Sequence, residues 1–102
     1  MSRIEQLTAM HEADPSDPFL SYGIAMEHGK AEAFEQAIEW LDRTLAIDEA
    51  YCYAYYQKAR MLGELGEDAR ARGILAKGMA AARAAGDEHA ESEMSELLAT
   101  LD

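Results

Sequence analysis

Residues 18–51 read PFLSYGIAMEHGKAEAFEQAIEWLDRTLAIDEAY, and residues 52–85 read CYAYYQKARMLGELGEDARARGILAKGMAAARAA. Written one under the other, the two stretches agree where a packed helical hairpin needs side chains of a particular size. The matched pairs are Phe19 with Tyr53, Tyr22 with Tyr56, Ala25 with Ala59, Gly29 with Gly63, Ala37 with Ala71, and Leu41 with Leu75. Self-similarity at a fixed period of about 34 residues predicts a stack of structural repeats, each one a helix–turn–helix.

Apolar residues recur at helical spacing along the whole chain, and this pattern predicts about six helices. The expected ranges are 3–13, 18–28, 32–47, 50–65, 67–84 and 87–101. Asp17 is a good N-cap for the second helix, with Pro18 at the first helical position, where its missing N–H costs nothing, and Asp87 can cap the sixth helix. The connections of two to five residues predict that neighbouring helices are antiparallel.

The repeated alanines and leucines indicate how such hairpins pack. Ala25 and Ala59 fall where the two helices of a hairpin cross, and a small side chain there lets the backbones approach. Ala37 and Ala71 are the matching small residues on the second helices. Leu41 and its equivalent Leu75 are expected to fill the space between hairpins. One hairpin cannot bury its apolar face alone, so stacking is required.

On these residues the chain resembles the tetratricopeptide repeat family. The resemblance implies an all-α fold, a right-handed α–α superhelix of antiparallel hairpins in one domain over residues 1–102. It implies a half-repeat helix (1–17), repeat 1 (18–51), repeat 2 (52–85) and a capping helix (86–102). Three departures stand out: Glu32 replaces the glycine usual in the inter-helix turn, and Gly73 and Gly78 lie inside a helix. The register also places Glu93 where a small residue is expected, so 87–101 is interpreted as a cap.

Composition and charge indicate which partners and which compartment to expect. The chain has 102 residues, 49% of them hydrophobic, and a net charge of -11, with segment 58–83 positive and the remainder strongly acidic. Clustered Lys and Arg are needed to neutralise phosphates, so nucleic acid is not the expected partner. No apolar run is long enough to cross a membrane. The single cysteine, Cys52, fits a reducing compartment, and we expect a cytoplasmic protein.

In the family that the chain resembles, the first helix of each hairpin lines a concave groove that holds a peptide. The resemblance therefore implies a non-catalytic protein–protein interaction module. By position, the partner-binding residues are Phe19, Tyr22, Met26, Lys30, Tyr53, Tyr56, Arg60 and Glu64. Two alternatives stay open. The aromatic residues are covered by the cap or by a second copy of a self-associating homodimer, or the chain is an auxiliary, secretion-chaperone-like subunit. Both a monomer and a weak homodimer are compatible with the sequence.

Nothing in the sequence points to an enzyme, a cofactor or a metal. His11, His28 and His89 are far apart, and no Gly-rich phosphate loop, G-x-S-x-G elbow or H-E-x-x-H pair occurs. Trp40 is expected to pack against the next hairpin. Four tyrosines, at positions 51, 53, 55 and 56, crowd one and a half turns, so at least one must face solvent or a partner.

Overall fold

The computed structural model describes residues 1–101, and this range folds into six α-helices without a strand. The helices are α1 (Arg3–Ala13), α2 (Pro18–Lys30), α3 (Phe34–Ile47), α4 (Cys52–Glu64), α5 (Asp68–Ala85) and α6 (Glu88–Ala99). The expected fold class, all-α with about six helices, is confirmed.

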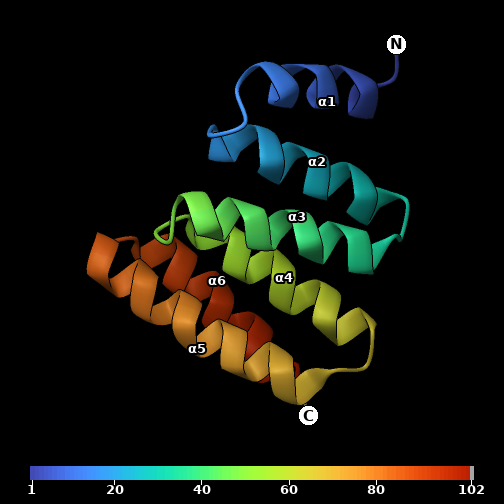
Figure 1. Cartoon of the computed structure of the whole chain (residues 1–102). Coiled ribbons are helices and arrows are strands. Elements are labelled where there is room, and N and C mark those ends of the chain that lie inside the picture. The colour runs from blue at the N-terminus through green and yellow to red at the C-terminus, as the bar shows by residue number, and fades with distance from the viewer. Residues whose placement is uncertain (102) are drawn as a thin grey trace.

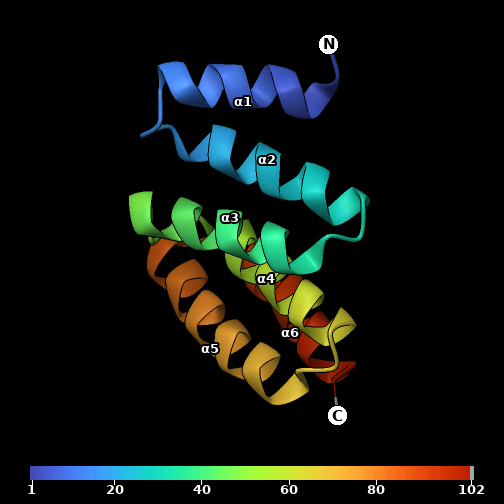
Figure 2. The same ribbon diagram turned by 45° about the vertical axis from the view of Figure 1, so that its right-hand side comes forward.

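The helices stack in chain order from α1 at one end to the α5–α6 pair at the other (Figure 1). Each packs against its predecessor, and α6 also returns to contact α4. Viewed from 45° away, α6 lies beside both α4 and α5 (Figure 2). The described chain is an elongated slab of 39 × 29 × 18 Å. The first helices of the two hairpins, α2 and α4, both pack against α3.

Local hydrogen bonds explain where the helices begin. Ser2 and Glu5 form a capping box at α1, and the Asp17 carboxylate accepts the Phe19 N–H at 2.9 Å at the start of α2. Asp87 accepts the Ala90 N–H at 3.0 Å and caps α6. The predicted capping roles of Asp17 and Asp87 are confirmed.

Two helix starts predicted from the sequence were wrong by two residues. α3 begins at Phe34 rather than at residue 32, because Glu32 has a left-handed φ of 59° that no helix continues through. α4 begins at Cys52 rather than at residue 50, because the Asp48 carboxylate accepts the Ala50 N–H at 2.9 Å and forms a turn. The last predicted apolar residue of the cap, Leu101, follows the end of α6.

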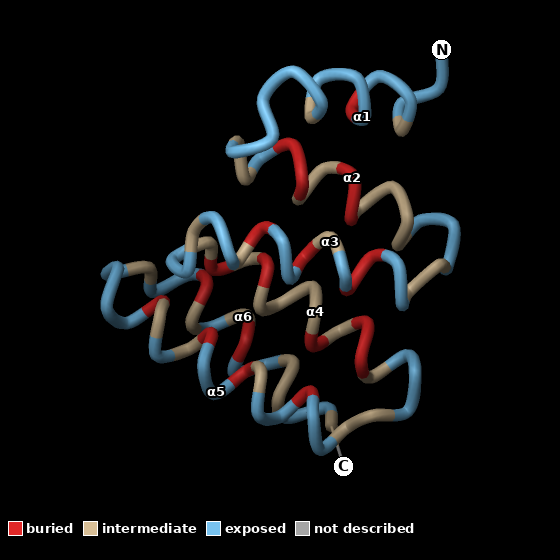
Figure 3. The backbone as a smooth tube through the Cα atoms, viewed as in Figure 1, coloured by how far each residue is buried: buried red, intermediate tan, exposed pale blue. Residues whose placement is uncertain are grey.

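The core lies where the repeated small and branched residues face each other (Figure 3). Four alanines and two leucines at equivalent places in the two repeats have no exposed surface at all: Ala25, Ala37, Ala59, Ala71, Leu41 and Leu75. Their predicted burial is confirmed. A second, smaller cluster of Leu7, Leu20 and Ile24 joins α1 to α2, so α1 shares a core with the first hairpin.

One pair of positions is filled differently in the two repeats. In the first, the Ser21 and Thr44 hydroxyls are 2.8 Å apart and fully buried between α2 and α3. In the second repeat, the equivalent residues are Tyr55 and Gly78, and a methyl group added to Gly78 would lie 2.6 Å from Tyr55 Cβ. The glycine inside α5 is therefore required, since the larger tyrosine occupies the space opposite.

Trp40 is half-buried, and it contacts the preceding helix. Its ring borders both clusters, but the edge of its ring system meets His11 of the preceding helix, with ring centroids 5.0 Å apart and nearly perpendicular. The Arg43 guanidinium lies 4.2 Å from the Trp40 ring centroid. Trp40 therefore ties α1 to α3, and its predicted packing against the next hairpin stays a prediction.

The two glycines of α5 give opposite predictions for the same substitution. Gly78→Ala should lower the free energy of unfolding by about 1–3 kcal/mol, because the new methyl group overlaps Tyr55 Cβ and Met94 Sδ. Gly73→Ala should raise it by about 0.5–1 kcal/mol, because a methyl group there meets no neighbouring atom within 4 Å and alanine favours the helix. Urea denaturation followed by circular dichroism measures both; equal stabilisation by the two variants would contradict the packing described.

Glu32 provides a second test, because it shares its place in the repeat with Gly66, whose φ is 78°. A left-handed conformation costs a non-glycine residue roughly 1–2 kcal/mol. Glu32→Gly should therefore raise the free energy of unfolding by about 0.5–1 kcal/mol, after allowing for the greater entropy of glycine in the unfolded chain. The control Glu35→Gly, inside the first turn of α3, should lower it by a similar amount.

Candidate functional site

A band of tyrosines runs along α2 and the start of α4, and we call it the tyrosine face: Tyr22, Tyr51, Tyr53 and Tyr56. The Tyr22 and Tyr51 rings have their centroids 5.0 Å apart, and those of Tyr53 and Tyr56 are 6.3 Å apart. All four side chains are half-buried. They are fixed by one another and by the core beneath, yet part of each ring remains accessible.

The eight predicted groove residues separate into two groups by exposure. Tyr22, Met26, Tyr53, Tyr56 and Arg60 are half-buried, whereas Phe19, Lys30 and Glu64 are exposed, Phe19 by 60%.

The structure brings some of these residues together. Arg60 donates to Gln57 Oε1 at 2.9 Å, and both side chains lie near the Tyr22 hydroxyl. Lys30, by contrast, pairs with Glu27 of its own helix at 3.0 Å. The contacts between predicted residues therefore centre on the tyrosines of α2 and α4.

The cap borders this surface on the side of α4. Tyr56 shares a hollow with Glu93, Glu96, Leu97 and Thr100 of the C-terminal segment. Leu101 lies close to Gly63, at 3.5 Å from where a β-carbon on that glycine would be. Because Tyr53 and Tyr56 nevertheless remain half-exposed, α6 forms one wall of the surface without closing it.

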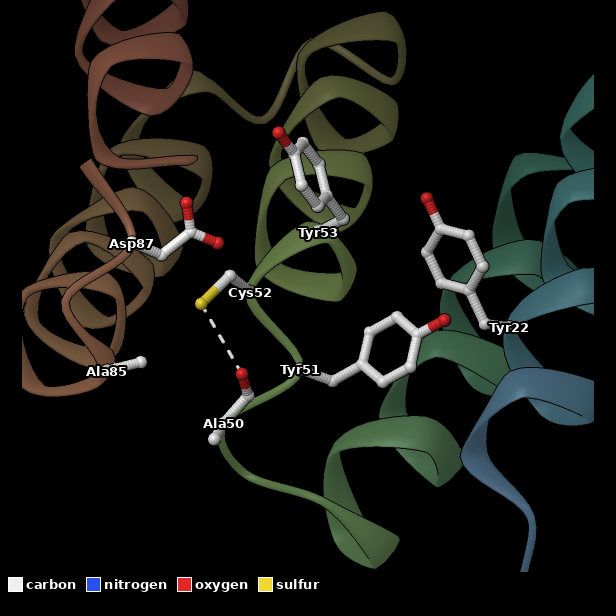
Figure 4. Close-up of a pocket in the computed structure, with 7 residues that line it drawn as sticks. All are labelled: Tyr22, Ala50, Tyr51, Cys52, Tyr53, Ala85 and Asp87. Atoms are coloured by element: carbon white, nitrogen blue, oxygen red, sulfur yellow. Dashed lines mark hydrogen bonds between the residues drawn. The ribbon is translucent and has the colours of Figure 1, made fainter. Parts of the chain in front are cut away.

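A pocket of about 400 Å³ opens between the tyrosine face and the turn that joins α5 to α6 (Figure 4). It is lined by Tyr22, Ala50, Tyr51, Cys52, Tyr53, Ala85 and Asp87. Figure 4 shows the rings of Tyr22 and Tyr51 side by side, with Asp87 across the pocket beyond Cys52.

Sequence reasoning missed two of the side chains in this pocket. Tyr51 precedes α4, and its equivalent in the first repeat is Asp17, so the repeat gave no aromatic match for it. Asp87 was recognised only as a helix cap. The crowding of four tyrosines within six residues was the one available signal for Tyr51.

Burial and nearby carboxylates raise the pKa values of the tyrosines. Desolvation raises the pKa of Tyr51, and the negative charges of Asp17 and Asp48 raise it further. For Tyr53, desolvation again comes first, followed by the charges of Glu93 and Asp87. Desolvation raises the pKa of Tyr22 as well, while Gln57 and Arg60 act in the opposite direction. These shifts indicate a negative potential at the pocket rings of Tyr51 and Tyr53.

Metal binding finds no support among residues 1–101, where no three potential ligands come together. His11 packs on Trp40, and His89 pairs with Glu93 on the same helix at 2.5 Å. Over the same range, no helix combines the length and apolar character needed to cross a bilayer.

Comparison with known proteins now adds to this geometry. No protein-family model matches the sequence, and no curated protein matches it. A protein from Bordetella parapertussis, known from a solution structure, superposes with a TM-score of 0.84 at 26% identity, covering 96% of this chain and 85% of the other. A tetratricopeptide repeat domain protein from Salinibacter ruber superposes with a TM-score of 0.77 at 28% identity, over 83% and 86% of the two chains.

A third solved structure, PcrH, contains a bound segment, the chaperone binding region of PopD. It superposes with a TM-score of 0.87 at 18% identity, covering 93% of this chain and 72% of the other. With these likenesses and the hairpin stack, the chain is a small protein of tetratricopeptide-repeat-like fold, as its sequence predicted.

The reactivity of Cys52, one of the residues that line the pocket, tests whether its thiol is buried. Its thiol is 7% exposed and hydrogen-bonded to the Ala50 carbonyl at 3.3 Å; desolvation, followed by the charge of Asp87, raises its pKa. A raised pKa leaves less thiolate at pH 8, so an aromatic disulfide reagent should react at least about tenfold more slowly with the folded protein than with the protein unfolded in guanidinium chloride. Equal rates would contradict the buried, thiol form.

Proposed function

We propose that this chain is a non-catalytic module that binds a segment of another protein on its tyrosine face. The observation that carries this proposal is the set of four half-buried tyrosines from α2 and the start of α4, packed in pairs but not covered. Rings that are already held in place lose little conformational entropy when a partner packs on them. Such rigid aromatic groups are typical of the residues that contribute most to protein–protein binding.

The neighbouring side chains extend this surface. Phe19 and Met26 belong to the same helix as Tyr22, three residues before it and four residues after it, and add apolar area on the same side of that helix. Arg60 and Lys30 add positive charges further along α2 and α4, and Glu64 adds a negative one. The PcrH structure, which holds the chaperone binding region of PopD, supports the idea that an arrangement of this fold binds a segment of a partner.

The domain division predicted from the sequence is part of the proposal. The half-repeat helix (1–17), repeat 1 (18–51), repeat 2 (52–85) and the capping segment (86–102) act as one domain, and its binding surface spans the junction of the two repeats. The single buried cysteine fits a cytoplasmic setting. The acidic composition fits a protein as the partner rather than nucleic acid or a membrane.

Self-association is the second candidate, and one observation favours it. Met10 of α1 is exposed by 54%, and Met1, which precedes this helix, by 82%. In a longer repeat array another helix would cover the outer side of α1, and here a second copy would do so. This pairing would leave the tyrosine face free, so a dimer through α1 and a partner segment are compatible.

Light scattering on a sizing column separates a monomer from a dimer that buries the tyrosines. We expect a species near 11.3 kDa, or a dimer whose mass falls to that value in the Met10→Ala variant. A dimer that is lost in Tyr56→Ala and unaffected by Met10→Ala would place the tyrosine face in a self-interface and overturn the proposal.

Selection from a phage-displayed library of random peptides of about twelve residues tests binding directly. We expect enriched peptides whose affinity falls at least about tenfold in Tyr22→Ala and Tyr56→Ala, because each change removes a preorganised ring. Each variant should lose less than about 2 kcal/mol of unfolding free energy, since the rings are only half-buried. Met10→Ala is the matched control. Failure to enrich any peptide that depends on these tyrosines would contradict the proposed function.

A further inference from the structure

The pocket of about 400 Å³ combines aromatic rings with a carboxylate. Three of its seven lining residues are tyrosines, and the one charged residue among them is Asp87. Tyr22 comes from α2, Tyr51 and Tyr53 come from the start of α4, and Asp87 precedes α6. Stacking of the hairpins therefore builds this pocket from parts that are far apart in the sequence (Figure 4).

Two further carboxylates, Asp17 and Asp48, do not line the pocket, but their negative charges add to the desolvation that raises the pKa of Tyr51. Like Asp87, each is fixed by a backbone hydrogen bond: Asp17 to the Phe19 N–H, Asp48 to the Ala50 N–H and Asp87 to the Ala90 N–H. Within the part of the chain that the structure describes, none of the three forms an ion pair. Their negative charges are thus held in place and left uncompensated by a basic side chain.

The starts of the helices offset only part of this charge. α2, α4 and α6 all begin on the same side of the stack, at the left in Figure 1. The N-terminus of a helix carries roughly half a positive charge, so three helix starts offset about half of the three carboxylates. The positive charge of Arg60 acts on the Tyr22 hydroxyl, and its guanidinium donates to Gln57 Oε1. Asp87 therefore places a negative charge, which no basic side chain of residues 1–101 pairs with, in the same pocket as three aromatic rings.

We propose that this pocket binds a cationic side chain, lysine or arginine, of the partner segment. The inference rests on the proposed function, because the cation reaches the pocket as part of a segment lying on the tyrosine face. A cation over an aromatic ring is attracted by the negative face of the ring, and carboxylates around it strengthen the attraction. The same charges that disfavour a tyrosinate at Tyr51 and Tyr53 favour a positive group in front of them.

A metal ion fits this pocket less well than an organic cation. Metal sites need several ligands that converge at short distances, and no such group occurs in residues 1–101. The three aspartates lie in three different turns between helices, and one carboxylate oxygen of each already accepts a backbone N–H. Rings and dispersed carboxylates instead match an ammonium or guanidinium group on an apolar stem.

An NMR titration with small, end-blocked amino acids tests the pocket without any partner segment. The probes are N-acetyl-lysine amide and N-acetyl-arginine amide, with N-acetyl-norleucine amide as the neutral control of similar shape, each added up to about 50 mM. We expect the ring signals of Tyr22, Tyr51 and Tyr53 to shift and approach saturation with the two cations. Norleucine amide should shift them much less, and added salt should weaken the binding of the cations.

Two variants localise the effect. Asp87→Asn keeps a good helix cap but removes the charge, and should weaken binding of both cations about threefold to tenfold. Glu39→Gln, on the exposed side of α3, changes the net charge equally and should leave the affinity unchanged. Circular dichroism establishes that both variants keep their helicity.

The outcomes separate this inference from the proposed function. Equal shifts with norleucine amide, or no shifts with any probe up to about 50 mM, overturn the cation pocket even if library peptides bind the tyrosine face. An equal loss of affinity in Asp87→Asn and Glu39→Gln overturns it too, because general charge attraction would then explain the binding. Cation binding at the rings with no library peptide enriched would support the pocket as a cation site and contradict the peptide-binding function.

Discussion

Close approach of the two helices in each hairpin is the constraint on which the rest of the structure depends. Ala25 and Ala37 belong to the two helices of the first hairpin, and Ala59 and Ala71 to those of the second. All four are completely buried. A larger side chain at the crossing would push the helices apart. Leu41 and Leu75, also completely buried, would then lose the contacts that join successive hairpins. The spacing of α2 and α4, and with it the tyrosine face, follows from these four small residues.

The same constraint determines which tyrosines remain available to a partner. Tyr55 occupies the place that Ser21 has in the first repeat, and Gly78 makes room for it. Its hydroxyl donates to the Glu49 carbonyl at 2.8 Å, so this ring holds the turn before α4 in position. Its neighbours Tyr53 and Tyr56 project from other sides of the helix and reach the surface. Thus one tyrosine of the cluster serves packing, and the others form the candidate site.

The fold could be predicted from the sequence because its determinants repeat. The 34-residue register identified Ala59 and Leu75 as core residues, and capping chemistry identified Asp17 and Asp87 as helix starts. The starts of α3 and α4 were misplaced because they depend on the left-handed φ of Glu32 and on the Asp48 turn, which interrupt the apolar pattern locally. Periodicity reports which face of a helix is buried and carries little information about its first residue.

The pocket could not be predicted in the same way, and the reason is geometric. Tyr51 and Asp87 lie in turns, outside both the helical period and the repeat register, and they meet only because the α5–α6 turn comes back beside the start of α4. Alternate helices of an antiparallel stack begin on the same side of it, so the residues of the turns before them lie on that side. In this chain Asp17 and Asp87 cap α2 and α6, and Asp48, the C-cap residue of α3, lies in the turn before α4. Aspartates that cap helices or form the turns between them thereby also place negative charge beside the tyrosine face. In the proposed function, this charge favours a partner that carries a positive side chain.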